Sequence, residues 1–251
     1  AAGNIALGNL SLSAITSGDD NVALGKSALL AATTNSYNTA VGAEALKTAD
    51  GGENNNVAVG WGAGQLVNNS NAAENVFVGT YTGRGGTGAL KHSVAIGAQA
   101  LDATAGNDIT GTVAIGHNAL TELTSGAGNV AIGYQCGDSL TTGVSNTFIG
   151  YQTGSAVTNN NNNTYVGYNS GLQNTGEKNV AVGNHTIKNG SGAGSHNTAL
   201  GSSALYGLTS GEKNIAIGVE ALHDVTDGEN NIGIGHNAGD AMTSSVGCVL
   251  I

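Results

Sequence analysis

The residues of this 251-residue chain that could carry chemistry are few and scattered. Acidic turns such as DGGEN at 50–54 and DGEN at 227–230 offer oxygen ligands of the kind that calcium prefers, but they do not recur in register. GRGGTG at 83–88 has the glycine spacing of a dinucleotide-binding loop, which must be followed by a helix that this sequence does not predict. No nucleophile–base pair or carboxylate pair stands out among the six histidines and 17 acidic residues. We therefore expect no enzymatic activity, no metal site and no cofactor.

Aromatic side chains provide the one candidate binding surface. Tyrosines directly follow a repeated glycine in three successive repeats, and amide side chains accompany them. Aromatic rings beside amide groups suit sugar rings, although stacked rings also stabilise one another without a ligand. The candidate glycan-contact strip consists of Trp61, His117, Tyr134, Tyr151, Tyr168, Gln135 and Gln152.

A short repeat must position these side chains. The motif Asn, β-branched residue, Ala, aliphatic residue, Gly recurs fourteen times at spacings of 16 to 19 residues, most often 17. Its glycines are Gly8, Gly25, Gly42, Gly60, Gly79, Gly97, Gly116, Gly133, Gly150, Gly167, Gly183, Gly201, Gly218 and Gly235. The β-branched residues predict a strand, and the glycine predicts a corner with a positive φ angle. An Ala-Leu pair after the glycine predicts a second short strand in many repeats.

Repeats of this length predict an all-β solenoid of about fourteen coils. One coil cannot bury its apolar face alone, so successive coils must stack at about 4.8 Å and pair their equivalent strands in parallel. Asparagine precedes the strand in twelve of the fourteen copies, and stacked amides can hydrogen-bond along the axis as a ladder. We expect a single repetitive segment over residues 1–251.

The middle residue of each strand predicts self-association. Ala occupies this position in ten of the fourteen copies. Since a strand that is apolar on both faces is buried on both, we expect the flanking residues to fill the coil and the middle column to face a sister chain. The predicted interface column includes Ala23, Ala58, Phe77, Ala95, Ala131, Phe148, Tyr165 and Ala216.

The repeats resemble those of known fibrous proteins. NVAVGWGA at 56–63, SVAIGAQAL at 93–101, NVAIGYQCG at 129–137 and NIAIGVEAL at 214–222 resemble the head repeat of trimeric autotransporter adhesins. They also resemble the longer repeats of bacteriophage tail fibres, which the 17-residue period favours. The resemblance implies a left-handed parallel β-roll in an intertwined homotrimer that serves host attachment through a glycan or protein receptor. It places the chain in a virion tail fibre or, alternatively, in a bacterial adhesin head on the outer cell surface.

Composition and spacing argue against several other roles. The net charge is −10, whereas a nucleic-acid partner demands clustered Lys and Arg. No run of 18 apolar residues is present, so we expect no membrane insertion by this segment. An ice-binding solenoid needs a regular threonine column, and no column here is uniformly Thr. Cys136 and Cys248 lie seven coils apart, roughly 34 Å, which is too far for a disulfide.

Overall fold

The computed structural model describes residues 1–86, 88–104, 108–189 and 192–251. The chain divides into two compact units, Ala1–Asn129 and Val130–Ile251, and each is considered by itself. Both units are built from stacked parallel strands, and the described residues contain no helix. The prediction of an all-β parallel solenoid of about fourteen coils is confirmed.

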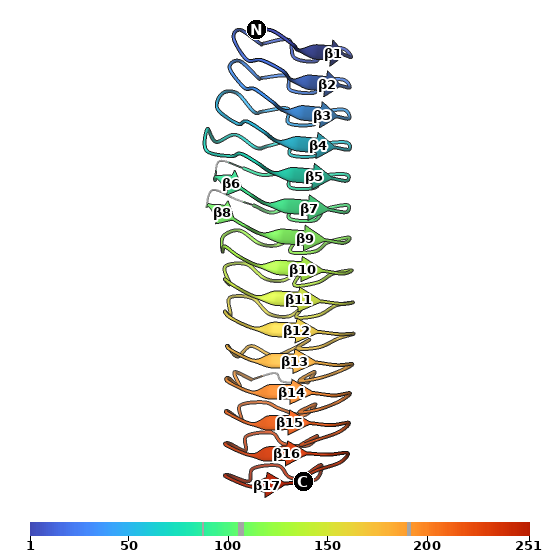
Figure 1. Cartoon of the computed structure of the whole chain (residues 1–251), viewed down its shortest axis with the longest axis vertical. Helices are drawn as coiled ribbons and strands as arrows, with labels where there is room; N and C mark the ends of the chain where they lie inside the picture. Colours follow the sequence, from blue (N-terminus) through green and yellow to red (C-terminus); the bar gives the residue numbers. More distant parts are fainter. Residues whose placement is uncertain (87, 105–107, 190–191) are drawn as a thin grey trace. The chain divides into compact units, whose positions relative to one another are not determined.

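Within each unit, each coil contributes one short strand that pairs with the equivalent strand of the next coil (Figure 1). In the first unit these strands are β1 (Ile5–Leu7), β2 (Val22–Leu24), β3 (Thr39–Val41), β4 (Val57–Val59), β5 (Val76–Val78), β7 (Val94–Ile96) and β9 (Val113–Ile115). In the second unit they are β10 (Val130–Ile132), β11 (Thr147–Ile149), β12 (Thr164–Val166), β13 (Val180–Val182), β14 (Thr198–Leu200), β15 (Ile215–Ile217), β16 (Ile232–Ile234) and β17 (Val249–Leu250). Equivalent residues face each other across every pair, as in Ala199 opposite Ala216.

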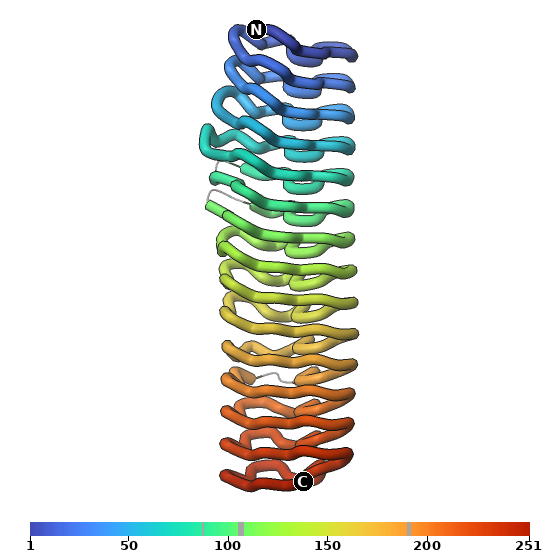
Figure 2. The backbone as a smooth tube through the Cα atoms, viewed as in Figure 1, coloured from blue at the N-terminus to red at the C-terminus, as the bar shows by residue number. Residues whose placement is uncertain are grey.

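The predicted second strand is wrong for most coils. The residues after the glycine form turns, and within each unit the backbone tube doubles back over itself there (Figure 2). Leu29 and Leu46 have φ angles of 48° and 46°, in the left-handed region where a backbone cannot extend as a strand. This conformation costs a bulky residue about 1 to 3 kcal/mol. It is held because Leu29 is fully buried and its N–H donates to the Ala45 carbonyl of the next coil at 3.0 Å.

One additional strand pair exists among the described residues, in the first unit. Strands β6 (Leu90–Lys91) and β8 (Ile109–Thr110) pair in parallel and precede β7 and β9 respectively. They therefore come before the repeated strand in the sequence, whereas the Ala-Leu pattern predicts a second strand that comes after it.

In β2 to β5, β7 and β9 to β16 the middle residue of the strand is buried in the interior of its own coil, so the predicted interface column is wrong. Every residue named for that column is 0% exposed in the single chain: Ala23, Ala58, Phe77, Ala95, Ala131, Phe148, Tyr165 and Ala216. The first and third strand residues, which were expected to fill the coil, lie at the surface instead. A side chain that its own coil already covers has no area left to bury against a second chain.

The interior is filled by two complementary positions, which explains this orientation. Where the strand carries a ring, as at Phe77 and Phe148, the fourth residue after the glycine is itself a glycine, at Gly83 and Gly154 respectively. A Cβ atom on Gly83 would lie 2.1 Å from the ring of Phe77, so no side chain fits there. Where the strand carries Ala, that position usually holds a buried Leu. A thin coil has room for one large side chain from either side, but not from both.

A ladder of buried asparagines runs beside the strands, as predicted. In the second unit Asn197 Oδ1 accepts hydrogen bonds from the main-chain N–H and the side-chain amide of Asn214, at 2.9 and 3.1 Å. The Asn197 amide also donates to the Gly211 carbonyl at 2.9 Å. In the first unit the ladder weakens where serine replaces asparagine, since the Thr112 N–H lies 3.5 Å from Ser93 Oγ. The ladder satisfies main-chain donors that the strands leave unpaired.

Candidate functional site

The residues of catalytic or metal-binding type remain dispersed in the structure. Among the described residues no group of three or more His, Cys, Asp or Glu side chains could hold a metal ion, and no pocket is present. Thr87, within the GRGGTG segment, lies outside the described residues. The described part of the chain also contains no helix that could cross a membrane.

Both cysteines are free, as the spacing predicted. Cys136 is fully buried at a position that holds Ala in many other coils. Burial raises the pKa of the Cys136 thiol to about 12, so little thiolate forms near neutral pH. Cys248 is partly exposed and its sulfur lies 3.9 Å from the Val246 carbonyl oxygen.

The three tyrosines of the candidate strip form a continuous stack in the second unit. Ring centroids are 5.2 Å apart for Tyr134 and Tyr151 and 5.3 Å apart for Tyr151 and Tyr168, with interplanar angles of 12° and 13°. The accompanying amides also pair with each other, because Gln152 Nε2 donates to Gln135 Oε1 at 2.9 Å. We call Tyr134, Tyr151 and Tyr168 the tyrosine ladder.

A glycine in front of each tyrosine allows this close stacking. A Cβ atom on Gly133 would lie 2.1 Å from the Gly150 carbonyl oxygen, so any larger residue would force the coils apart. The φ angle of Gly133 is 143°, which a residue with a side chain rarely adopts. The tyrosines therefore succeed one another at the spacing of the coils, with their faces turned toward each other.

The stack continues through further aromatic side chains, which do not occupy the same repeat position as the three tyrosines. His185 packs edge-on against Tyr168, and Tyr206 stacks on His223 with centroids 5.0 Å apart. His185 stands two residues after its repeat glycine, whereas Tyr206 and His223 stand five residues after theirs. The repeat columns could not join them because the turn brings different sequence positions to the same surface. Burial, assisted by Lys188, lowers the pKa of His185, which favours the neutral ring.

Trp61 and His117, the other aromatic members of the strip, lie in the first unit. Trp61 is 51% exposed and packs against Tyr81 of the next coil, with centroids 4.6 Å apart and planes tilted by 47°. The guanidinium of Arg84 lies over the Tyr81 ring at 5.3 Å, and its Nε atom is 2.9 Å from Asp102 Oδ1. We call Trp61, Tyr81, Arg84 and Asp102 the Trp61 cluster.

Only Trp61 of this cluster was predicted from the sequence. Tyr81 occupies the second position after its repeat glycine, a column that elsewhere holds mostly Asn, Gln, Ser or Glu and no other tyrosine. Its ring lies across Gly62, where a Cβ atom would be 2.7 Å from the ring carbons. The adjacent glycine was the one sequence signal that a large side chain crosses this position. Burial raises the pKa of Asp102, although the neighbouring Arg84 acts in the opposite direction.

The outward-facing residues of the repeated strands form the largest apolar surface. We call the first and third residues of these strands the outer columns. In the first unit Val57, Val59 and Ile96 are 36 to 37% exposed. In the second unit Ile132, Ile149, Val180, Leu200, Ile215, Ile217 and Ile234 are 36 to 48% exposed, and Val249 of the last strand is 67% exposed. Each unit thus presents two parallel rows of Val, Ile and Leu side chains, with some Thr, along one face of its sheet.

Comparison with known proteins gives no further guide to function. No family model matches this chain, and neither a curated protein nor a solved structure matches it. The outer columns and the two aromatic surfaces are therefore the observations from which function can be argued.

Proposed function

We propose that this chain is a segment of a homotrimeric fibre, of the bacteriophage tail-fibre type, that projects or forms a host-attachment surface. The observation that supports this proposal is the pair of outer columns, which are apolar and exposed in the single chain. A contiguous apolar surface of this kind marks a protein–protein contact. The number of chains and the left-handed sense of the coil are taken from the resemblance of the repeats.

Self-association through the outer columns has a favourable energy. Ten Val, Ile and Leu side chains of these columns, three in the first unit and seven in the second, retain about 36 to 48% of their surface in water. Covering that remainder contributes roughly 0.5 to 1.5 kcal/mol per residue, because full burial of such a side chain is worth about 1.5 to 3 kcal/mol. Summed over ten such residues this offsets the entropic cost of bringing chains together.

The work of such a fibre is mechanical. Every coil is hydrogen-bonded to its neighbours through strands, turns and asparagines, so the backbone offers few unpaired segments to proteases. Association of three chains would cover the apolar face and leave the turns, with their aromatic side chains, at the outside.

The proposal is tested by the mass of the chain in solution and by one pair of variants. Multi-angle light scattering should give three times the 24.5 kDa of a single chain. Ile217→Lys, in an outer column of β15, should dissociate the assembly because it places a charge in the contact. Val219→Lys is the matched control, since Val219 is 47% exposed in the same coil but lies beyond the strand. A stable monomeric wild-type chain at micromolar concentration would refute the proposal.

The second candidate is the head of a bacterial trimeric autotransporter adhesin that binds a host surface or matrix. The outer columns and the repeat motif also support this candidate, whereas the 17-residue period favours the tail-fibre type. The two candidates differ in location, so antibodies against this chain should label tail fibres of phage particles in one case and the bacterial outer surface in the other.

A further inference from the structure

The two aromatic surfaces differ in what they can offer a ligand. In the tyrosine ladder the rings are nearly parallel at 5.2 to 5.3 Å, so each face of Tyr151 is covered by a neighbour. At Tyr151 only the edge of the ring and the hydroxyl group face outward. A sugar that packs its C–H face against an aromatic ring requires an open face. The stacking therefore argues against the tyrosine ladder as a platform for sugar rings.

Trp61 has the geometry that the tyrosine ladder lacks. Its plane is tilted by 47° from that of Tyr81, and about half of its surface is exposed. The Tyr81 ring also contacts Gly62, and the Arg84 guanidinium lies over it. Trp61 is therefore a large aromatic side chain on a supported surface, and its own ring is not enclosed in a parallel stack.

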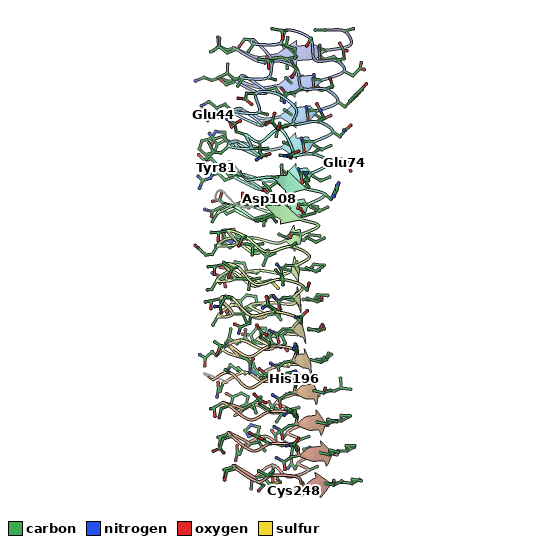
Figure 3. The ribbon with its side chains drawn as sticks, turned by 90° about the vertical axis from the view of Figure 1, so that its left-hand side faces the viewer. Glu44, Glu74, Tyr81, Asp108, His196 and Cys248 are labelled. Carbon is green, nitrogen blue, oxygen red and sulfur yellow. The ribbon has the colours of Figure 1, made fainter. Side chains whose placement is uncertain are left out.

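Polar groups of both kinds flank this surface. Arg84 is 38% exposed and uses its Nε–H toward Asp102, which leaves the two terminal amino groups of the guanidinium to donate to a ligand. Glu44, two coils before Tyr81 in the same column, lies on the same side of the first unit (Figure 3). Its Oε2 accepts from Gln65 and pairs with Lys47 at 3.3 Å, so Oε1 is the acceptor that it offers to a ligand. Asp102 positions Arg84 and is too buried, at 11% exposure of its side chain, to serve as a main ligand contact itself.

We propose that Trp61, Tyr81 and Arg84, with Glu44 beside them, form a binding site for a neutral hexopyranose unit of a glycan. The Trp61 ring receives the apolar face of the sugar, Arg84 donates to its hydroxyl oxygens and Glu44 accepts from its hydroxyl groups. Each cation at the site is paired with a carboxylate, Arg84 with Asp102 and Lys47 with Glu44, so no excess positive charge attracts an anionic sugar and the site favours a neutral one. The inference deepens the proposed attachment role by naming a ligand class, and its test does not depend on self-association.

The chain contains its own reporter for this site, since Trp61 is the one tryptophan in the sequence. The full chain is titrated with cellohexaose, maltohexaose, mannohexaose and chitohexaose while tryptophan emission and its quenching by iodide are recorded. Binding of at least one oligosaccharide should shift the emission to shorter wavelength and protect Trp61 from iodide. Light scattering on the same samples reports self-association separately.

Three variants locate the binding. Arg84→Gln should weaken the affinity about tenfold or more, because it removes charged donors while leaving the reporter in place. Trp61→Ala should abolish the heat of binding in calorimetry. Tyr151→Ala, in the tyrosine ladder, is the control and should bind as the wild type does, since Tyr151 is likewise exposed, at 43%.

Three results would overturn the inference. The first is an unchanged emission and quenching with all four oligosaccharides at millimolar concentration. The second is an equal loss of affinity in Tyr151→Ala and Trp61→Ala, which would move the site to the tyrosine ladder. The third is binding of a sialylated or uronate-containing oligosaccharide alone, which would contradict the assignment of a neutral sugar.

Discussion

The complementary filling of the coil interior predicts a strong energetic coupling between Phe148 and Gly154. Phe148 is fully buried, and its ring stacks on Tyr165 with centroids 5.4 Å apart. Phe148→Ala should lower the free energy of unfolding by about 4 kcal/mol, through lost burial and a cavity. Gly154→Leu should lower it by about 2 kcal/mol, because a Cβ atom there would already lie 3.0 Å from the Phe148 ring.

The double variant recreates a combination that the chain already uses. Phe148→Ala with Gly154→Leu gives the Ala and Leu pair of other coils, such as Ala199 with Leu205. We expect it to lose about 3 kcal/mol, since the stack on Tyr165 is not restored, against about 6 kcal/mol for the sum of the single variants. The coupling energy is then about 3 kcal/mol, near the upper end for residues in contact.

Urea unfolding followed by far-ultraviolet circular dichroism measures these differences at a fixed chain concentration. A control combines Phe148→Ala with Leu222→Ala, which is several coils away, so the two losses should add to within about 0.5 kcal/mol. Additive losses for Phe148→Ala and Gly154→Leu would refute the argument, because the two positions would then not share one space.

Two further predictions concern buried polar atoms. Asn197→Ala should cost about 2 to 4 kcal/mol in urea unfolding, since the buried Asn214 N–H loses its acceptor, whereas Asn159→Ala on the exposed surface should change stability by less than about 0.5 kcal/mol. Equal effects of the two would show that the ladder does not stabilise the chain. Cys136 should resist thiol reagents in the folded chain. Its raised pKa stabilises the folded chain fully below pH 9, the ordinary value, and this contribution should fall as pH rises toward about 12, because the unfolded thiol ionises first. Cys136→Ala should remove that part of the pH dependence, and an unchanged profile would contradict the assignment.

The strands and the asparagine ladder could be predicted because each depends on one residue type at one repeat position. β-branched residues at alternate positions specify an extended backbone whatever lies around them. Asn at a fixed position has the donors and acceptor to bond its own equivalent in the next coil. Because fourteen copies carry the same pattern, an exception in one copy does not obscure the prediction.

The orientation of the strand could not be read from the strand alone. All three residues of a strand such as Val-Ala-Val are apolar. The alternation therefore assigns the first and third residues to one face and the middle residue to the other, but it does not show which face is turned to the interior of the coil. The deciding signal lay elsewhere in the repeat, in the glycines that accompany Phe77, Phe148 and Tyr165 across the coil. The prediction of a second strand failed for a different reason. A buried Leu in a turn and a buried Leu in a strand give the same apolar pattern in the sequence, and only the backbone angle distinguishes them.

The Trp61 cluster could be predicted least of all. Tyr81 and Arg84 occur once each at their repeat positions, and Asp102 shares its position with only Asp138 and Asp240, so no repeated column predicts the cluster. Their proximity depends on how the turns of successive coils overlap, which is a property of the three-dimensional path and not of the spacing.

The stacking register also bears on how such a chain changes over generations. Ile215 lies directly over Thr198, and the strand, asparagine and turn contacts of that coil are made with the coils on either side. An in-frame duplication of residues 198–214 would insert a coil whose upper and lower surfaces are already accepted by its neighbours. Recombination between near-identical gene segments can therefore add or remove coils without requiring a new hydrophobic core. The number of coils can change in this way while the surface residues of each coil stay the same.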